Sequence, residues 1–480
     1  MDILNQAKDL RETLVSWRRA LHACPEIGFD LPRTKTLILQ ELTAMGYSPK
    51  EVGRGSIVAH VGPSEGIKID GTVARVGAEL DSGVSRARLA EGAGIDGTVA
   101  RVGAGRDSGV SRARPAEGVE KGNYVSRVGD TVGAEKGNNV SRAGHTVGAE
   151  KGNNVSRAGH TVGAEILLRA DMDGLAIPEA ARVEFRAING NMHACGHDMH
   201  TAMLLGAAAM LKAREGELSR GVRLLFQGAE EILQGAEDAV AHGVCEGIGA
   251  AYMIHVTVNT RLPVGTVIVP PAGVIAPSAD YFEITVQGKG CHGADPASGI
   301  DPLSAAARIL LGLQHLPARE IPSGERGMLT VGMIHGGDAF NVIPEAARLG
   351  GSLRCYGEDF RQVLKTRTEQ IARGVAEAFR TRAEVQFPAQ CPSLVNDEGL
   401  RNRLCDALRG ELGTDRLIVV DTPTGTAGSE DFSVISRTVP SVMLALAAGD
   451  PTVALHHPGI VFDEDALVYG TAALVTAAIR

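Results

Sequence analysis

Apolar residues recur along this chain with two different periods, and the two periods alternate. Residues 2–23 and 34–45 show the helical period, and a helix rich in Ala, Leu and Met follows His200. Short apolar runs at 223–226 and 251–254, bounded by glycine or polar residues, indicate buried strands. Strands that alternate with helices in this way predict an α/β layer sandwich.

The pattern changes near Ile275, where a second group of elements begins. Residues 281–286 alternate between apolar and polar, as a half-buried strand does. Further elements are predicted as a helix at 301–315, strands at 328–335 and 348–355, and a helix at 358–380. This β-α-β-β-α-β-like order predicts a small inserted α+β domain. We therefore expect a discontinuous catalytic domain (1–65, 166–272 and 386–480) and a lid or dimerisation domain at 273–385.

Residues 66–165 interrupt the first domain with tandem repeats. A unit that begins IDGTVARVGA at Ile69 recurs from Ile95, and a unit that begins VGAEKGNNVSRAGHT at Val132 recurs twice. The segment has no Phe or Trp and is rich in Gly, Ser, Asn and Arg. This composition favours disorder over the alternative, a short β-solenoid. The insertion separates two predicted strands, so we expect it at a loop tip, where long additions cost little.

Charge and composition exclude several classes of partner. The net charge is −9, and apolar and charged residues make up 44% and 22% of the chain. No basic bias indicates binding to nucleic acid or to an anionic membrane surface. We find no signal peptide, and no apolar run approaches the ~18 residues of a membrane span. Seven scattered cysteines are typical of reduced thiols, so we expect a soluble cytoplasmic protein.

The densest cluster of reactive side chains is HACGHD, at residues 193–198. Cys195 and His197 are two positions apart, a spacing that suits a loop or strand end, whereas helical ligand pairs are three or four apart. Thiolate and imidazole together favour a borderline transition metal over calcium or magnesium. The alternative is a buried structural cysteine beside a satisfied core histidine.

Three other segments offer further metal ligands. Glu230 and Glu231 follow a predicted buried strand, so one carboxylate could bind metal while the other acts as a general base. The alternative is a solvated helix start, where acidic residues favour the N-terminal dipole. His255 ends another predicted strand, and His456 lies far down the chain. Taken singly each is weak, but five such donors with a bridging water could hold two divalent ions.

The second domain contributes three candidates for contact with a substrate. His292 lies in a Gly-rich turn and could polarise a carbonyl, or be an ordinary exposed histidine. Asn341 could add an amide contact, and Arg354 could bind a carboxylate.

Together these segments resemble the amidohydrolase branch of the aminoacylase/carboxypeptidase-type dinuclear metallopeptidases, which includes hippurate hydrolases and auxin-conjugate hydrolases. The resemblance covers 1–65 and 166–480. Its motifs are RRALHACPEIGF (18–29), RADMDGLAI (169–177), MHACGHDMHTA (192–202), FQGAEE (226–231), HV (255–256), GKGCHGADP (288–296), NVIPEAA (341–347), GSEDFS (428–433) and LHHP (455–458).

The resemblance implies a role for each candidate residue. The implied metal ligands, for two divalent ions (Mn, Zn, Co or Ni), are Cys195, His197, Glu231, His255 and His456. Glu230 matches the general base, His292 the lid histidine that acts across a dimer interface, and Asn341 the lid asparagine near the substrate. Asp171 and Asp173 match the family's DMD segment, in which a carboxylate orients neighbouring groups.

The chain departs from the family pattern at two positions beside functional residues. Gly228 replaces a usual proline, and Cys291 replaces a usual glycine. We expect hydrolysis of N-acyl amino acids such as N-benzoyl or N-acetyl substrates, by a metal-activated water with Glu230 as base, in a homodimer formed through the lid. The alternatives are a dipeptidase or carboxypeptidase-like enzyme, and a metal-binding homologue whose catalysis the repeats impair.

Overall fold

The structure is a computed structural model that describes residues 3–63, 164–258, 261–422 and 428–480. The predicted repeat insertion, and with it the choice between disorder and a solenoid, lies outside the described residues except for Ala164 and Glu165. Glu165 is the first residue of a buried strand, so regular structure resumes one residue inside the predicted end of the insertion.

A mixed eight-stranded sheet forms the centre of the catalytic part, which confirms the α/β prediction. In spatial order its strands are β1 (Lys50–Val52), β2 (Ser56–Val61), β4 (Val222–Gln227), β3 (Glu165–Asp171), β5 (Ile248–Thr257), β16 (Ser441–Ala447), β6 (Val267–Val269) and β15 (Leu417–Val419). β4, β3, β5 and β16 are parallel neighbours. Their carboxyl ends therefore meet at one edge of the sheet, where α/β proteins place their ligands.

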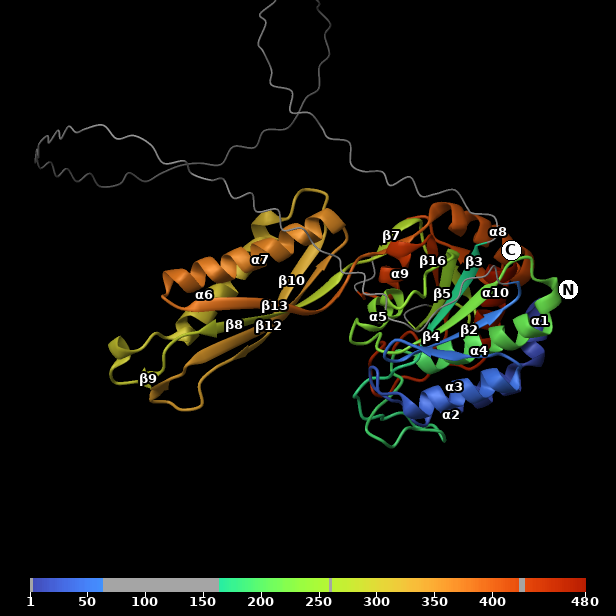
Figure 1. Ribbon diagram of the computed structural model, residues 1–480, viewed down its shortest axis with the longest axis horizontal. Helices are drawn as coiled ribbons and strands as arrows, with labels where there is room; N and C mark the ends of the chain where they lie inside the picture. Colours follow the sequence, from blue (N-terminus) through green and yellow to red (C-terminus); the bar gives the residue numbers. More distant parts are fainter. Residues whose placement is uncertain (1–2, 64–163, 259–260, 423–427) are drawn as a thin grey trace, which may run out of the picture. The chain divides into compact units, whose positions relative to one another are not determined.

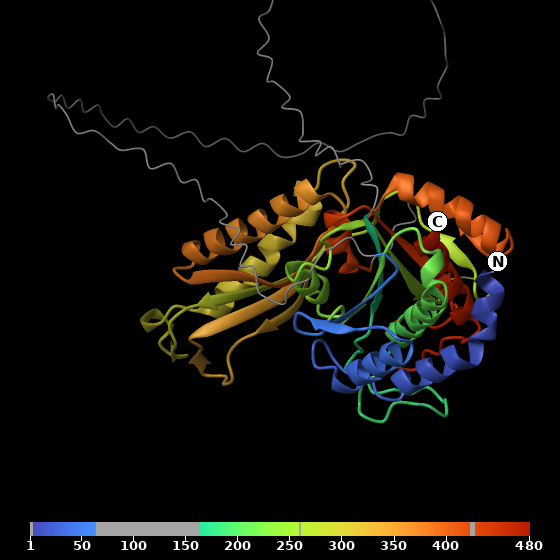
Figure 2. The same cartoon turned by 45° about the vertical axis from the view of Figure 1, so that its right-hand side comes forward.

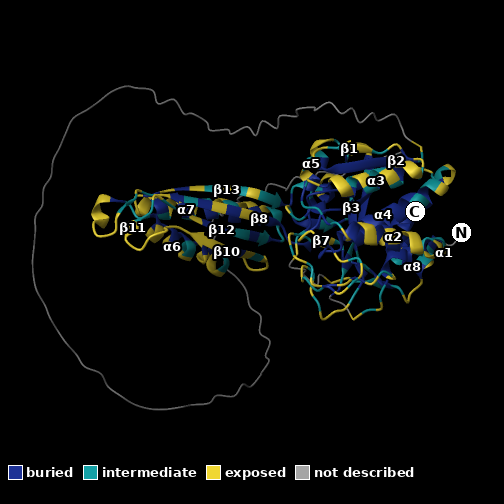
Figure 3. Ribbon diagram, turned by 90° about the horizontal axis from the view of Figure 1, so that it is seen from below, coloured by how far each residue is buried: buried dark blue, intermediate teal, exposed yellow. Residues whose placement is uncertain are grey.

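Helices cover both faces of this sheet because its central strands are apolar on both sides. Leu168 and Leu224 pack into one core, while Leu167 and Leu225, one residue away, pack into another. The first core includes α1 (Ile3–Asp9), α2 (Arg11–His22), α3 (Pro32–Ala44), α4 (His197–Ala213), α8 (Glu398–Leu412) and α10 (Ala466–Ile479). The second includes α5 (Gly235–Ala241) and α9 (Phe432–Thr438). Figure 3 shows β3 and α4 as largely buried.

The N-terminal region forms two helices where the apolar period predicted one over residues 2–23. A turn at Leu10 separates α1 from α2, although its backbone stays near helical values (φ −85°, ψ −3°). α1 lies beside α10, which brings the two ends of the described chain together (Figures 1 and 2). Within the described ranges, no helix combines the length and apolarity that a bilayer crossing requires.

The second domain has the predicted β-α-β-β-α-β order. Its four-stranded sheet, in spatial order, consists of β10 (Gly327–His335), β12 (Ala346–Cys355), β8 (Ala279–Gln287) and β13 (Arg382–Cys391). α6 (Pro302–Leu313) and α7 (Glu358–Ala378) lie side by side against this sheet (Figures 1 and 2). β13 continues past residue 385, where we expected the domain to end.

Short elements complete the described chain. β9 (Cys291–His292) pairs with β11 (Val342–Ile343), and β7 (Gly273–Ala276) pairs with β14 (Leu394–Asn396). Three single-turn helices are η1 (Glu215–Glu217), η2 (Pro296–Ser298) and η3 (Leu316–Glu320).

Candidate metal centre

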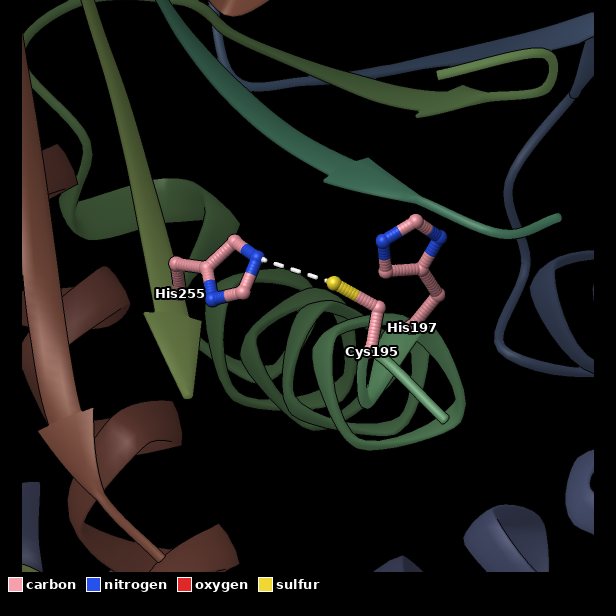
Figure 4. A group of neighbouring side chains, drawn as sticks. All are labelled: Cys195, His197 and His255. Carbon is pink, nitrogen blue, oxygen red and sulfur yellow. Dashed lines mark hydrogen bonds between the residues drawn. The ribbon is translucent and has the colours of Figure 1, made fainter. Parts of the chain in front are cut away.

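The first four residues of HACGHD (193–196) form a loop, and His197 and Asp198 are the first two residues of α4. Gly196 has φ +89°, and a Cβ atom there would lie 2.3 Å from Cγ2 of Val256, so the turn requires glycine. This turn directs Cys195 and His197 toward the end of β5, and the Sγ atom of Cys195 lies 3.6 Å from Nε2 of His255 (Figure 4). The loop geometry that the two-residue spacing predicted therefore brings a thiol and two imidazoles together.

His197 is oriented for contact with a cation. Its Nδ1 atom donates to the backbone carbonyl of Asp173 across 2.8 Å, which leaves Nε2 as the acceptor. Nε2 is buried and has no hydrogen-bond partner within the described part of the chain. Carboxylate oxygens of Glu230 and Glu231 each lie 3.8 Å from it. A buried acceptor that faces carboxylates is the arrangement that a bound metal ion satisfies.

Glu230 and Glu231 occupy a strained turn after β4. The preceding residue, Ala229, has φ +61°, and Leu233 has φ +55°. The carboxylate of Asp173 holds the turn by accepting from the backbone N–H groups of Glu230 (3.1 Å) and Glu231 (3.2 Å). Residues other than glycine rarely adopt positive φ. The rest of the fold therefore holds this turn in place against the cost of backbone strain.

Burial and the crowding of acidic groups raise the pKa values of the two glutamates in this turn. Burial and the carboxylates of Glu430 and Glu231 raise the pKa of Glu230 well above its ordinary value. Burial raises the pKa of Glu231 to about 7, although His197 acts in the opposite direction. Carboxylates that repel one another in a dry site favour a cation that neutralises them.

His456 reaches the same site from the C-terminal region. Its backbone N–H donates to the carbonyl of Ala194 across 3.0 Å, and its Nε2 lies 3.8 Å from Oε1 of Glu231. It has φ +66°. Of the four non-glycine residues with positive φ in the described ranges, three therefore lie in the segments that carry Glu230, Glu231 and His456. Strain of this kind concentrates at functional sites.

The predicted ligands and Glu230 form overlapping groups in which the ligand atoms lie within 4.8 Å of one another. The groups are Cys195, His197 and His255; Cys195, Glu231 and His456; and His197, Glu230 and Glu231. Oε1 of Glu231, like Nε2 of His197, is buried without a hydrogen-bond partner among the described residues. Sulfur, nitrogen and oxygen donors in this arrangement fit two divalent transition metal ions.

A buried polar network lies beneath the site, and apart from Asp171, to which the resemblance gave an orienting role, its members were not predicted from the sequence. Oδ1 of Asp171 lies 2.6 Å from Nδ1 of His200, and Arg169 bridges Asp171 to Asp431, 2.7 Å from each. We had placed His200 at the start of a helix, but α4 begins at His197. The three-residue spacing of His197 and His200 on one helix was the available signal, because such residues share a face.

The lid candidates lie outside the metal groups described above. His292 and Asn341 are neighbours: His292 pairs with Val342, and the carbonyl of Asn341 accepts from Gly293 across 2.7 Å. Nδ1 of His292 accepts from the N–H of Ala294 across 3.0 Å. Arg354 donates from Nη1 to the hydroxyl of Ser429 across 2.8 Å.

Comparison with known proteins identifies relatives of this chain. N-acetylcysteine deacetylase of Bacillus subtilis is 35% identical over 303 residues, which cover 63% of this chain and 77% of that protein. The IAA-amino acid hydrolase ILR1-like 4 of Arabidopsis thaliana is 36% identical over 324 residues, covering 66% of this chain and 72% of that one.

A solved structure also matches along almost the full length. It is the Bacillus subtilis YXEP protein, described as a dinuclear metal binding peptidase of the M20 family, with a TM-score of 0.64 and 25% identity over 98% of both chains. The sequence model of peptidase family M20/M25/M40 matches residues 167–480, which include every metal-ligand candidate. The chain belongs to peptidase family M20/M25/M40.

Proposed function

We propose that this chain hydrolyses the amide bond of N-acyl amino acids and releases a carboxylate and a free amino acid. As a member of its family the chain is a metal-dependent amidohydrolase. The observation that carries the proposal is the burial of Glu230 beside five donors of the type that bind transition metals. The two relatives above support the substrate class, since the first is named for an N-acetyl amino acid and the second for an IAA-amino acid.

The residues that would hold two divalent ions, of Zn, Mn, Co or Ni, are Cys195, His197, Glu231, His255 and His456. When bound, the ions would lower the pKa of a water molecule and polarise the amide carbonyl.

Glu230 is placed for both proton transfers of amide hydrolysis. Its raised pKa brings the carboxyl group closer to the range in which a residue can accept a proton and return it. It would take the proton of the attacking water and deliver it to the leaving amine. The carboxylate of Asp173 accepts from the backbone N–H of Glu230 and so fixes the position of Glu230. The Glu230 carboxylate therefore does not have to be ordered during the reaction.

The lid residues would complete the site around the substrate. We assign His292 to the oxyanion that forms on the amide carbonyl, Asn341 to the substrate amide and Arg354 to the substrate carboxylate. We also propose a homodimer through the lid. Its edge strand β10 supports this, because Met328, Met333 and Ile334 are about half exposed there.

A substrate panel tests the proposal. Purified protein, loaded separately with Zn, Mn, Co or Ni, is incubated with N-acetyl and N-benzoyl amino acids and with unblocked dipeptides, and free amino acid is measured. We expect turnover of the N-acyl substrates with at least one metal and much slower cleavage of the dipeptides. Preferred cleavage of dipeptides would favour a peptidase. Bound metal in a folded protein with no turnover of any amide would favour an impaired homologue.

A further inference from the structure

A cavity of about 550 Å³ lies at the amino ends of β3 and β5, between the sheet and helices α8 and α10. Gly249 and Ala250, near the start of β5, line it, whereas His255 lies near the other end of the same strand. The cavity is therefore separate from the metal centre. Its volume is in the range of small-molecule binding sites.

Part of the cavity wall is apolar, and small side chains leave room there. Ala250, Ala477 and Ala478 leave room, and Ile166 and Leu404 add larger apolar surface. All five are buried. A ligand held here would gain from burial of its own apolar surface against this wall.

One polar group faces the cavity. Tyr252 lines the cavity and is only 7% exposed as a residue, and its hydroxyl makes no hydrogen bond to another described residue. Burial raises the pKa of Tyr252 to about 12, and Arg403 and Arg220 oppose this shift while Asp397 adds to it. Both arginines also line the cavity, so the phenol and the two guanidinium groups border the same space. The Tyr252 hydroxyl is not among the fully buried atoms that lack a partner in the described part of the chain, so it is open to the cavity and can reach a ligand there.

We propose that this cavity binds a small carboxylate with an apolar aliphatic or aromatic body. The body would lie against Ile166, Leu404 and the alanines, and the carboxylate would accept from Arg220, Arg403 and the Tyr252 hydroxyl. The exposed arginines provide the charge complementarity, because a guanidinium binds a carboxylate through paired N–H donors. This inference does not depend on the proposed function.

Fluorine NMR of para-fluorophenylacetate with the full-length, metal-loaded protein tests the proposal. We expect binding by the wild type and at least ~10-fold weaker binding of the neutral isostere para-fluorophenylacetamide. Arg220→Ala and Arg403→Ala should each weaken carboxylate binding by about 10-fold, and Tyr252→Phe, which removes only the hydroxyl, by about 3- to 10-fold.

Arg409→Ala is the matched control, since Arg409 lies on α8 with Arg403 but does not line the cavity. Inhibition of amide hydrolysis by the same probe reports binding at the metal centre, and the cavity variants should leave it unchanged. Thermal unfolding checks that each variant is folded. The proposal is overturned if the amide binds as tightly as the carboxylate, or if the cavity variants bind the probe like the wild type. Absence of binding would overturn it too.

Discussion

His200 donates a hydrogen bond from Nδ1 to Oδ1 of Asp171 across 2.6 Å, and this contact fixes the tautomer of the imidazole. The backbone N–H of Val256 donates to Nε2 across 2.9 Å, so Nε2 is the acceptor. The second oxygen of Asp171 accepts from Arg169 across 2.7 Å. Asp171 therefore connects α4 to β3 directly beneath His197, and both of its oxygens are occupied by protein donors.

Arg169→Gln should strongly destabilise the protein. The guanidinium is 1% exposed and lies 2.7 Å from Asp171, 2.7 Å from Asp431 and 3.1 Å from Glu430. Its removal leaves buried carboxylates without their cation, which costs about 3–5 kcal/mol of unfolding free energy. Urea denaturation measures the loss, with the exposed Arg382→Gln in β13 as the control. Equal stability of the two variants would contradict the structural role of the network.

Glu230→Gln should abolish turnover and preserve metal binding. Glutamine keeps the shape of the side chain and the backbone contact to Asp173, but it cannot accept and return a proton. Loss of a general acid–base lowers kcat by about 10²- to 10⁴-fold. Steady-state kinetics and metal analysis check both parts, and Glu237→Gln, exposed on α5, is the control. A variant with near wild-type kcat would remove Glu230 from its assigned role.

Cys195→Ser should lower the metal content below two ions per chain. The Sγ atom of Cys195 is shared by two of the ligand groups, one with His255 and one with Glu231 and His456. A serine hydroxyl is a harder and weaker ligand for the borderline metals that thiolate and imidazole select. Elemental analysis after dialysis measures the loss, and Cys245→Ser is the control outside the site. Two ions retained by the serine variant would argue against Cys195 as a ligand.

Much of the fold and the position of the site could be predicted from local sequence. The central strands are short apolar runs. Glu230 lies three residues after the end of β4, and His255 lies near the end of β5, so parallel pairing gathers both residues at one edge of the sheet. The buried polar network beneath the metal ligands could not be predicted in this way. Arg169 and Asp431 are separated by 262 positions, and no local pattern indicates that they touch.

Close packing explains why glycine stands at position 228, where the family usually has proline. A Cβ atom at this position would lie 2.7 Å from Cδ1 of Leu31 and 3.0 Å from the carbonyl oxygens of Gly28 and Gly55. Such contacts require the neighbouring backbone to move, so glycine suits the packing of this chain. The sequence showed the substitution, but only the tertiary contacts explain it.

Stability should decrease as the pH rises through the raised pKa of His22. Nδ1 lies 2.8 Å from Asp198 and Nε2 lies 3.1 Å from Glu179, so a proton on each nitrogen gives both carboxylates a donor, while Arg18, 3.3 Å from Nδ1, acts against the charged imidazole. Burial opposes the charged imidazole, but Asp198 and Glu179 raise the pKa of His22 above its ordinary value of 6.5. This contribution is fully present below about pH 6.5, the pKa of an unfolded histidine, and is lost as the pH rises from there through the raised pKa of the folded state.

Comparison of His22→Gln with the wild type isolates this effect. Urea unfolding of both proteins is measured between pH 5.5 and 9, which is about one unit below and more than two units above the unfolded pKa. The stability difference between the two proteins should shrink as the pH rises. His315→Gln, at an exposed position in the lid, should leave the pH dependence of the wild type unchanged. A difference that stays constant with pH would mean that His22 is not protonated in the folded state.

The two ends of the repeat insertion are fixed to the same point of the fold. The imidazole of His60, at the end of β2, lies 2.9 Å from Glu165, and Glu165 lies 2.7 Å from Arg223. A Cβ atom on Gly221 would be 2.7 Å from the carbonyl oxygen of Pro63 and 3.1 Å from Cγ of Glu165. The described residues on either side of the insertion are thus close enough for a short turn to join them.

Replacement of residues 64–163 by a short Gly-Ser turn should therefore preserve both the fold and the activity. Every metal-ligand candidate, and Glu230 with them, lies outside the deleted segment. A shorter loop also reduces the entropy lost when its ends are joined, by about 0.6 kcal/mol for each halving of length, so the melting temperature should stay equal or rise. Kinetics on an N-acyl substrate and thermal unfolding of both proteins measure the outcome. Higher kcat/KM in the deletion variant would show that the repeats impair catalysis, whereas an unfolded variant would show that the fold requires them.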